Sequence, residues 1–495
     1  MRSRCGRSAV LLLWVAALAG ISAPSAAASD VPSFRLDVLP VLSAAGCNSG
    51  ACHGKSRGQN GFRLSLGAFD PEGDYASIVE QSRGRRISPA APRSSLLLRK
   101  ATAEVPHGGG RRCDEGDPAY ETLLRWIAAG APRAADDETR LLGISIAIEP
   151  GSKQQLAIFA HYSDGSRRDV TALCSYQSSD PMVARVSPAG NVETGSMPGQ
   201  ATVMVRFMGH VATHVVTQPY GERAGDDFYE HLPRRNFIDE LIWNKLRELG
   251  LRPAPAAEDA TLHRRAWLDI VGRLPPADEV RQYLADKSSD KRARLIDRLL
   301  ERAEFADYWA NQWADLLRPN PYRVGIKPTI VLDAWLRDAF RANMPYDRFA
   351  SELITARGST WRHGPAVIWR DRRTPEEAAT MVGQLFMGTR LECARCHDHP
   401  FESWRQDDFF ALAAFFARVG YKGAPLLPPI SGGEELIFTA EEGEYLHPRT
   451  QRPVAPRALS GGRQVALDTA DPREALADWL VADDNPYFAR AAVNR

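Results

Sequence analysis

The spacing of apolar residues divides the chain into segments of different predicted structure. In residues 120–127 the apolar positions recur at helical spacing, and Gly130 and the residues after it end the helix. From residue 141 to 219 the pattern changes to short alternating runs such as 144–148, separated by turn signals. This pattern predicts a small all-α domain over residues 30–132 and an all-β sandwich over residues 141–219.

Residues 235–420 have the pattern of a mainly α-helical domain. One predicted helix ends at Gly250, and its apolar side chains share one face: Ile238, Leu241, Ile242, Leu246 and Leu249. Residues 421–474 are rich in Gly, Pro and polar residues, which indicates a loop-rich linker region. The final segment, residues 475–495, again has a helical pattern. The chain is therefore predicted to be a multidomain protein.

The N-terminus, residues 1–28, has the pattern of a secretory signal peptide. A basic segment precedes a short apolar run over residues 9–19, and Ala26-Ala27-Ala28 supplies small residues for cleavage. The apolar run is too short to span a bilayer comfortably, and no later stretch approaches a membrane span. We therefore expect an exported mature chain without a transmembrane span, located in the periplasm or at the cell envelope.

Charge and cysteine usage narrow the function classes. A formal net charge of +1 on 495 residues gives no electrostatic basis for binding nucleic acid. Signal cleavage removes Cys5 from the total of seven cysteines, and four of the remaining cysteines lie in two clusters with histidine. In an oxidising compartment, close cysteine pairs become disulfides or cofactor attachments. Cys113 and Cys174 lie outside the clusters and could pair, although they fall in different predicted domains.

The sharper cluster is Cys393-Ala394-Arg395-Cys396-His397. In a C-x-x-C-H motif each thiol can form a thioether to a haem vinyl group, and the adjacent histidine binds the iron. We therefore expect haem c attached to Cys393 and Cys396, with His397 as an iron ligand.

Two other states are open at this cluster. Its cysteines and histidines, including His399, are acceptable zinc ligands, although His397 and His399 would crowd one ion. A plain disulfide is the other alternative. His399 is also too close to His397 to reach the opposite face of the same haem, so it is expected to support the site from outside. The candidates for a distal ligand are Met381, Met387 and His363.

The looser cluster places four residues between Cys47 and Cys52, followed by His53. We expect a second covalent haem here, with His53 as the proximal ligand, while a disulfide between the two cysteines is the alternative. Small c-type cytochromes commonly supply Met from a later loop, but the corresponding loop here contains His107 followed by glycines. Ligation by His53 and His107 should lower the potential, because Met/His ligation raises it. A vacant or water-bound iron is the alternative to His107.

Several motifs resemble known domains. Residues 46–55, 59–62 and 106–110 are similar to a cytochrome-c-like domain, and residues 162–171 and 178–184 to the bacterial Ig-like group 2 domain. The run Asp269-Ile270-Val271-Gly272-Arg273-Leu274-Pro275-Pro276 and residues 343–349 and 393–401 are similar to DUF1549, and residues 484–495 to the opening of DUF1553. The mature chain thus resembles large exported proteins of planctomycete-type bacteria that carry these domains.

The resemblance implies a cytochrome-c-like all-α domain, an Ig-like sandwich that acts as a spacer or binding surface, and a helical DUF1549 domain. It implies no reaction. Motifs of common hydrolases, such as G-x-S-x-G and H-E-x-x-H, are absent from the sequence. The sequence therefore does not decide whether the protein is an enzyme.

The leading functional hypothesis is an exported c-type haem protein with one or two haems. It would transfer electrons to or from a redox partner protein, and it could feed an attached oxidoreductase activity. One alternative is an envelope binding or adhesion protein with structural disulfides, whose Ig-like domain contacts polysaccharide. Another is a zinc-dependent hydrolase centred on residues 393–399.

Overall fold

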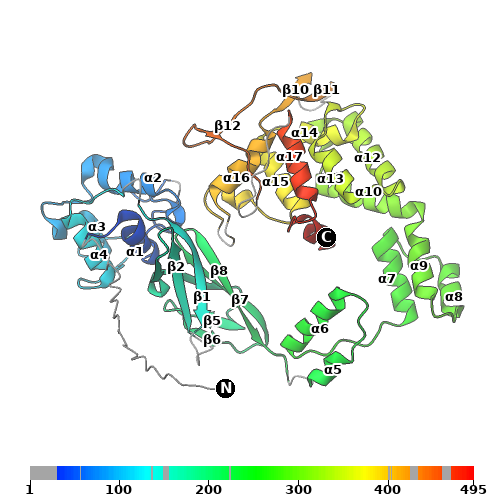
Figure 1. Ribbon diagram of the computed structural model, residues 1–495, viewed down its shortest axis with the longest axis horizontal. Helices are drawn as coiled ribbons and strands as arrows, with labels where there is room; N and C mark the ends of the chain where they lie inside the picture. Colours follow the sequence, from blue (N-terminus) through cyan, green and yellow to red (C-terminus); the bar gives the residue numbers. More distant parts are fainter. Residues whose placement is uncertain are drawn as a thin grey trace, which may run out of the picture.

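The computed structural model shows three successive units, which we call the N-terminal unit, the sandwich and the C-terminal unit (Figure 1). The predicted signal peptide and parts of the predicted linker lie outside the residues that the structure describes. The described residues are 31–55, 57–134, 138–148, 155–221, 225–399, 402, 404–423, 433–459 and 470–494.

The N-terminal unit, residues 31–134, is built from short helices around one core. Its longest helix, α4, begins after Asp117 with Pro118 at its first position, and Gly130 follows in a left-handed conformation with φ 90°. The apolar face of α4 includes Trp126, which is fully buried, so the predicted helix over residues 120–127 is confirmed. The α-helices of this unit are α1 (Leu39–Ala44), α2 (Pro71–Tyr75), α3 (Leu96–Ala101) and α4 (Pro118–Ala128).

The sandwich contains two three-stranded antiparallel sheets, with strand orders β1-β2-β3 and β4-β7-β8, and the small β5-β6 pair. Alternate residues of β2 and β7 point into the core, as Leu156, Ile158 and Ala160 do on β2. The strands are β1 (Leu141–Ile148), β2 (Leu156–Tyr162), β3 (Arg167–Asp169), β4 (Ser175–Ser178), β5 (Ala184–Val186), β6 (Val192–Thr194), β7 (Gly199–Phe207) and β8 (His210–Gln218).

The C-terminal unit, residues 225–494, is mainly helical, with a small antiparallel sheet of order β10-β11-β9. Its α-helices are α5 (Asp226–Glu230), α6 (Phe237–Leu249), α7 (Asp259–Val271), α8 (Ala277–Ala285), α9 (Lys291–Leu300), α10 (Ala303–Leu317), α11 (Pro321–Val324), α12 (Ile326–Arg341), α13 (Tyr346–Ile354), α14 (Val367–Asp371), α15 (Pro375–Phe386), α16 (Gln406–Ala413), α17 (Pro472–Val481) and α18 (Phe488–Val493). Its strands are β9 (Gly358–Ser359), β10 (Val419–Gly423), β11 (Glu435–Thr439), β12 (Tyr445–Leu446) and β13 (Pro453–Val454).

Two features of this unit differ from the simplest interpretation of the sequence. Helix α6 ends at Gly250 as expected, but its apolar face is not covered, and Leu241 is 61% exposed. Helix α17, which the sequence places in a separate terminal segment, shares one core with α10, α12 and α15. Leu476 and Leu480 of α17 are fully buried in that core. The division at residue 475 therefore does not separate two cores.

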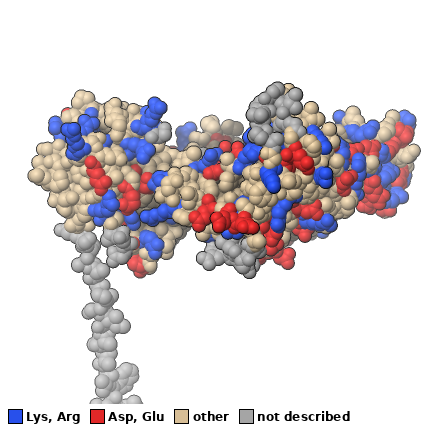
Figure 2. All heavy atoms as spheres, turned by 90° about the horizontal axis from the view of Figure 1, so that it is seen from above, with Lys and Arg blue, Asp and Glu red and all other residues tan. Residues whose placement is uncertain are grey.

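The three units contact one another. Arg168 of the sandwich pairs with Asp37 of the N-terminal unit at 3.3 Å. From the C-terminal unit, Arg449 pairs with Asp70, and its guanidinium lies 5.7 Å from the centroid of the Phe69 ring. Lys and Arg side chains are mixed with Asp and Glu over the face seen in Figure 2, where one group of acidic side chains lies near the middle. Within the described residues, no helix has the length and apolar character needed to cross a bilayer.

Asp74 provides a test of the packing in the N-terminal unit. Its side chain is 2% exposed, and burial raises its pKa to about 6 despite hydrogen bonds from the Ser65 amide and hydroxyl. Between the unfolded value of 3.8 and pH 6, the folded state binds more protons than the unfolded state, so stability falls as pH rises through this window. We expect Asp74→Asn to remove this part of the pH dependence, measured as the thermal unfolding midpoint from pH 4 to 6.5.

The control for Asp74 is Glu115→Gln, because Glu115 is exposed on the same unit. This variant should retain the wild-type pH dependence. The unfolding midpoint would then be compared between pH 4 and 6.5 in the wild type and in Asp74→Asn. The same change in both proteins would contradict the burial of a proton-binding carboxyl group at Asp74.

Candidate functional site

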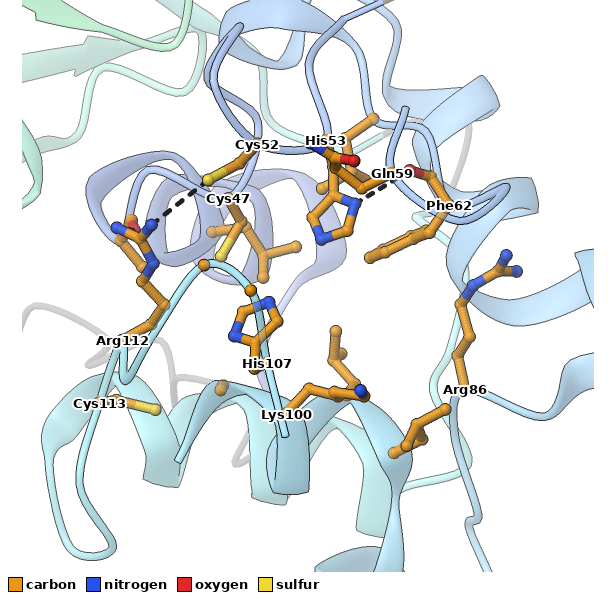
Figure 3. A pocket seen from close by; sticks show the side chains of 18 of the residues that line it. Cys47, Cys52, His53, Gln59, Phe62, Arg86, Lys100, His107, Arg112 and Cys113 are labelled. Atoms are coloured by element: carbon orange, nitrogen blue, oxygen red, sulfur yellow. Dashed lines mark hydrogen bonds between the residues drawn. The ribbon is translucent and has the colours of Figure 1, made fainter. Parts of the chain in front are cut away.

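The N-terminal unit contains a cavity of about 790 Å³. Cys47, Cys52 and His53 of the looser cluster line it together with the loop that carries His107. Figure 3 shows the imidazoles of His53 and His107 directed into the same space. Apolar side chains from α1, α3 and α4 form much of the remaining wall. The lining includes Val41, Leu42, Leu64, Leu96, Leu97 and Leu123. The cavity thus combines apolar walls with polar and charged side chains.

A tight backbone turn explains how a cluster with wide spacing can face one cavity. The amide of Cys52 donates to the Ser49 carbonyl at 3.0 Å, and the amide of His53 donates back to the Cys47 carbonyl at 2.9 Å. The turn closes at Gly54, where an added Cβ would lie 2.0 Å from the Asn48 carbonyl oxygen. Only glycine fits at that position, and the turn brings both thiols and His53 to the cavity wall.

His53 is held in the form that binds metals. Its Nδ1 lies 2.9 Å from the Phe62 carbonyl oxygen, and a carbonyl can only accept, so Nδ1 carries the proton and Nε2 carries the lone pair. Burial lowers the pKa of His53, which keeps the ring neutral at pH 7. Metal-binding histidines almost always donate their other ring nitrogen to such a group.

His107 has the same arrangement on the opposite wall. Its Nδ1 lies 2.8 Å from the Gly110 carbonyl oxygen, which again leaves Nε2 with the lone pair. The His53 and His107 rings are nearly parallel, with an interplanar angle of 8° and ring centroids 6.3 Å apart. The two rings therefore lie near each other in the cavity, and the edge of the His107 ring that carries Nε2 also lies beside Gly109.

The two thiols of this cluster differ in environment. Burial raises the pKa of Cys47 to about 11, while Cys52 accepts a hydrogen bond from Nη2 of Arg112 at 3.3 Å. All six cysteines of the described residues are free thiols, so the disulfide between Cys47 and Cys52 that the sequence left open is not formed. Both sulfurs remain available for a covalent attachment.

Cys113 is a cavity residue that the sequence analysis did not assign to the site. It lines the same cavity, is 7% exposed and is close enough to Cys47 to raise the pKa of that thiol. Cys113 follows the Gly108–Gly110 loop closely, and this position in the sequence was the signal that could have assigned it to the cavity. Cys174 lies in the separate core of the sandwich, so the pairing of Cys113 with Cys174 is not formed.

Basic side chains lie beside the cavity. Arg86 is 5% exposed and donates to the carbonyls of Ser77 and Gly61 at 2.7 and 3.1 Å. Its guanidinium lies over the Phe62 ring, 4.7 Å from the centroid. Arg85 and Lys100 also line the cavity. An acidic group on a bound molecule would therefore meet positive charge at this edge.

The second cluster lies on a short 3₁₀ turn of the C-terminal unit, Glu392–Arg395. Cys393 and Cys396 are exposed, and Nδ1 of His397 lies 2.6 Å from the Asp398 carbonyl oxygen. All three predicted iron ligands thus have Nδ1 bound to a backbone carbonyl. Among the candidate distal ligands, Met381 and Met387 are buried in the main core and His363 is half-buried, with its Nδ1 2.8 Å from the Arg357 carbonyl oxygen.

His399 is buried beside the second cluster. It is 6% exposed, and its Nδ1 accepts a hydrogen bond from the Glu402 amide at 3.0 Å. A backbone hydrogen bond to Arg390 acts on the same ring. Over the residues that the structure describes, no group of three or more His, Cys, Asp or Glu side chains is placed to hold a metal ion. The four-ligand zinc arrangement considered from the sequence is therefore not assembled here.

Comparison with known families identifies one part of the chain. Residues 237–421 match the family PSCyt2, described as Protein of unknown function (DUF1549). The match begins at α6 and ends within β10, and it includes the second cluster, so the predicted DUF1549 domain is confirmed. None of the curated proteins matches this chain.

Thiol reactivity tests the geometry of the cavity. A thiol with a pKa of about 11 has roughly one part in a thousand as thiolate at pH 8, so iodoacetamide should modify Cys47 far more slowly than the exposed Cys393 and Cys396. The rates can be read by peptide mass spectrometry on the folded chain. In urea all three should react at similar rates. Equal rates for Cys47 and Cys393 in the folded protein would contradict the buried position of Cys47.

Proposed function

We propose that this protein is an exported c-type haem protein that transfers electrons, with one haem bound in the cavity of the N-terminal unit. One observation supports the proposal most strongly. Two imidazoles and two free thiols line one cavity, and the two imidazole rings are nearly parallel. Thiols for covalent attachment and imidazoles for the iron are the groups that haem c requires.

The chain contributes binding, orientation and electrostatics. Cys47 and Cys52 would attach the porphyrin, and His53 and His107 would hold the iron from its two sides. The Phe62 and Gly110 carbonyls fix the orientation of the two rings. The haem itself supplies one-electron redox chemistry. Two imidazoles give a lower potential than an imidazole with a thioether, and the apolar wall limits access of water to the site.

Electrostatics at the rim also fits this ligand. Haem carries carboxylate groups on one edge, and Arg85, Arg86 and Lys100 place positive charge beside the cavity. Arg112 would lie at the thioether side, because its guanidinium already contacts the Cys52 sulfur. Charged and apolar walls on different sides would give the bound group one orientation.

The proposal includes an exported location and a redox partner protein. The signal-peptide pattern of residues 1–28 supports passage to the periplasm or envelope, where covalent haem attachment and oxidising conditions are found. The second cluster, within the DUF1549 match, would carry a second haem on Cys393 and Cys396 with His397 as ligand. A redox partner protein would exchange electrons with either site.

Cysteine variants test the proposal. The mature chain would be produced in a host with cytochrome c maturation and analysed by pyridine haemochrome absorbance and intact mass. We expect the double change Cys47→Ser and Cys52→Ser to remove one covalent haem, because both thioethers of the N-terminal site are lost.

Cys113→Ser is the matched control, because Cys113 lines the same cavity but lies outside the motif. It should retain the full haem content. Wild-type protein without covalent haem would refute the proposed function. Loss of haem in Cys113→Ser with retention in the double variant would refute the assignment of the attachment residues.

A further inference from the structure

The turn between β7 and β8 is the part of the sandwich that reaches toward both clusters. It consists of Met208 and Gly209, with φ values of 48° and 80°, and it joins the antiparallel pair that ends at Phe207 and His210. A two-residue turn with both central residues at positive φ is the tight hairpin type that favours glycine. Residues on its two sides contact different units of the protein.

On one side the turn contacts the N-terminal unit beside the first cluster. Met208 packs against the cores of both the sandwich and the N-terminal unit, and its Sδ lies 3.9 Å from the Ser43 hydroxyl. The same hydroxyl accepts a hydrogen bond from the Asn48 side chain at 2.7 Å. Asn48 directly follows Cys47 and is 5% exposed. Two contacts therefore connect the turn to the first cluster.

On the other side the turn contacts the second cluster. A Cβ added to Gly209 would lie 2.7 Å from Oδ2 of Asp398, so the backbone of the turn approaches this side chain closely. The backbone carbonyl of Asp398 accepts from the His397 ring and so orients it. In the side chain of Asp398, Oδ1 accepts a hydrogen bond from the Gln406 amide at 3.0 Å. His210 follows Gly209 directly, and its Nε2 accepts a hydrogen bond from Nη2 of Arg405 at 2.6 Å.

We infer that the β7–β8 turn is an internal docking element that positions the second cluster against the first. Through Met208 and Ser43 on one side and Gly209 and Asp398 on the other, it holds the two cysteine–histidine clusters at one fixed separation. The contact with Asp398 makes Gly209 a positioning residue for His397. This inference rests on the proposed function only for its redox meaning, since a fixed separation is what electron exchange between two haem sites requires.

The turn offers a test with a matched control in the same sandwich. Gly209 and Gly165 both have φ of 80°, but a Cβ on Gly165 has no neighbour within 4 Å. Alanine at either position therefore meets the strain of a positive φ, and only Gly209→Ala also collides with Asp398. Any difference between the two variants reports the contact with the second cluster.

Hydrogen exchange followed by mass spectrometry on the full mature chain is the measurement. We expect Gly209→Ala to raise the exchange rate about tenfold in the peptides that contain residues 391–399 and 404–413, as expected for partial release of a local contact. Gly165→Ala should leave these peptides unchanged. In an Asp398→Ala background, which makes room for the added methyl group, Gly209→Ala should have little further effect. Equal effects of Gly209→Ala with and without Asp398 would overturn the inference.

A second pair of variants covers the case in which Gly209→Ala does not fold. His210→Leu removes the acceptor for Arg405, whereas His210→Gln retains an acceptor oxygen. We expect faster exchange in residues 404–413 for His210→Leu only, and identical exchange in both variants would count against the docking role.

The same variants separate this inference from the proposed function. Exchange does not require a bound haem, so the predicted changes in a chain that carries no haem would support the docking element and refute the haem proposal. Normal covalent haem with no change in exchange would refute the docking element alone. In matured protein, the spectroscopic redox titration of one site should depend on the oxidation state of the other, and Gly209→Ala should reduce that dependence.

Discussion

Two hydrogen bonds from imidazole rings to backbone carbonyls fix the orientation of both histidines in the N-terminal cavity. Nδ1 of each ring donates to a backbone carbonyl, of Phe62 or of Gly110, and the two ring planes are nearly parallel. The carbonyls are fixed in turn by the loops that carry them. Without these two bonds the rings would lack a fixed orientation relative to the nearby thiols.

The surrounding structure serves this arrangement at two levels. Locally, the turn closed at Gly54 brings a cluster with unusual spacing to the cavity, so spacing along the chain matters less than the path of the backbone. Across the molecule, the sandwich is more than a spacer in the structure, because its β7–β8 turn contacts residues beside both clusters. The C-terminal unit also returns to the N-terminal unit through Arg449. These contacts place the DUF1549 region and the cavity in one assembly.

Local features of this protein could be predicted from the sequence, whereas long-range placement could not. The helix at residues 120–127, the stop at Gly250 and the residues of both clusters follow from short patterns. The apolar pattern of α6 predicted a helix with one apolar face, but burial depends on a partner, and Ile238, Leu241 and Ile242 of that face are exposed. The position of Cys113 in the cavity depends on chain packing that no spacing rule contains. For the same reason the approach of Gly209 to Asp398 has no signal in the sequence.

The most direct test of the account is the low-temperature electron paramagnetic resonance spectrum of the oxidised, matured protein, recorded for the wild type and for His107→Ala. Two nearly parallel imidazoles on one iron predict a low-spin ferric spectrum with the rhombic shape of aligned axial rings, and His107→Ala should convert that signal to high spin. His161→Ala, on the sandwich, should leave it unchanged. A wild-type N-terminal site that is already high spin, or a low-spin signal that survives His107→Ala, would contradict ligation by His53 and His107.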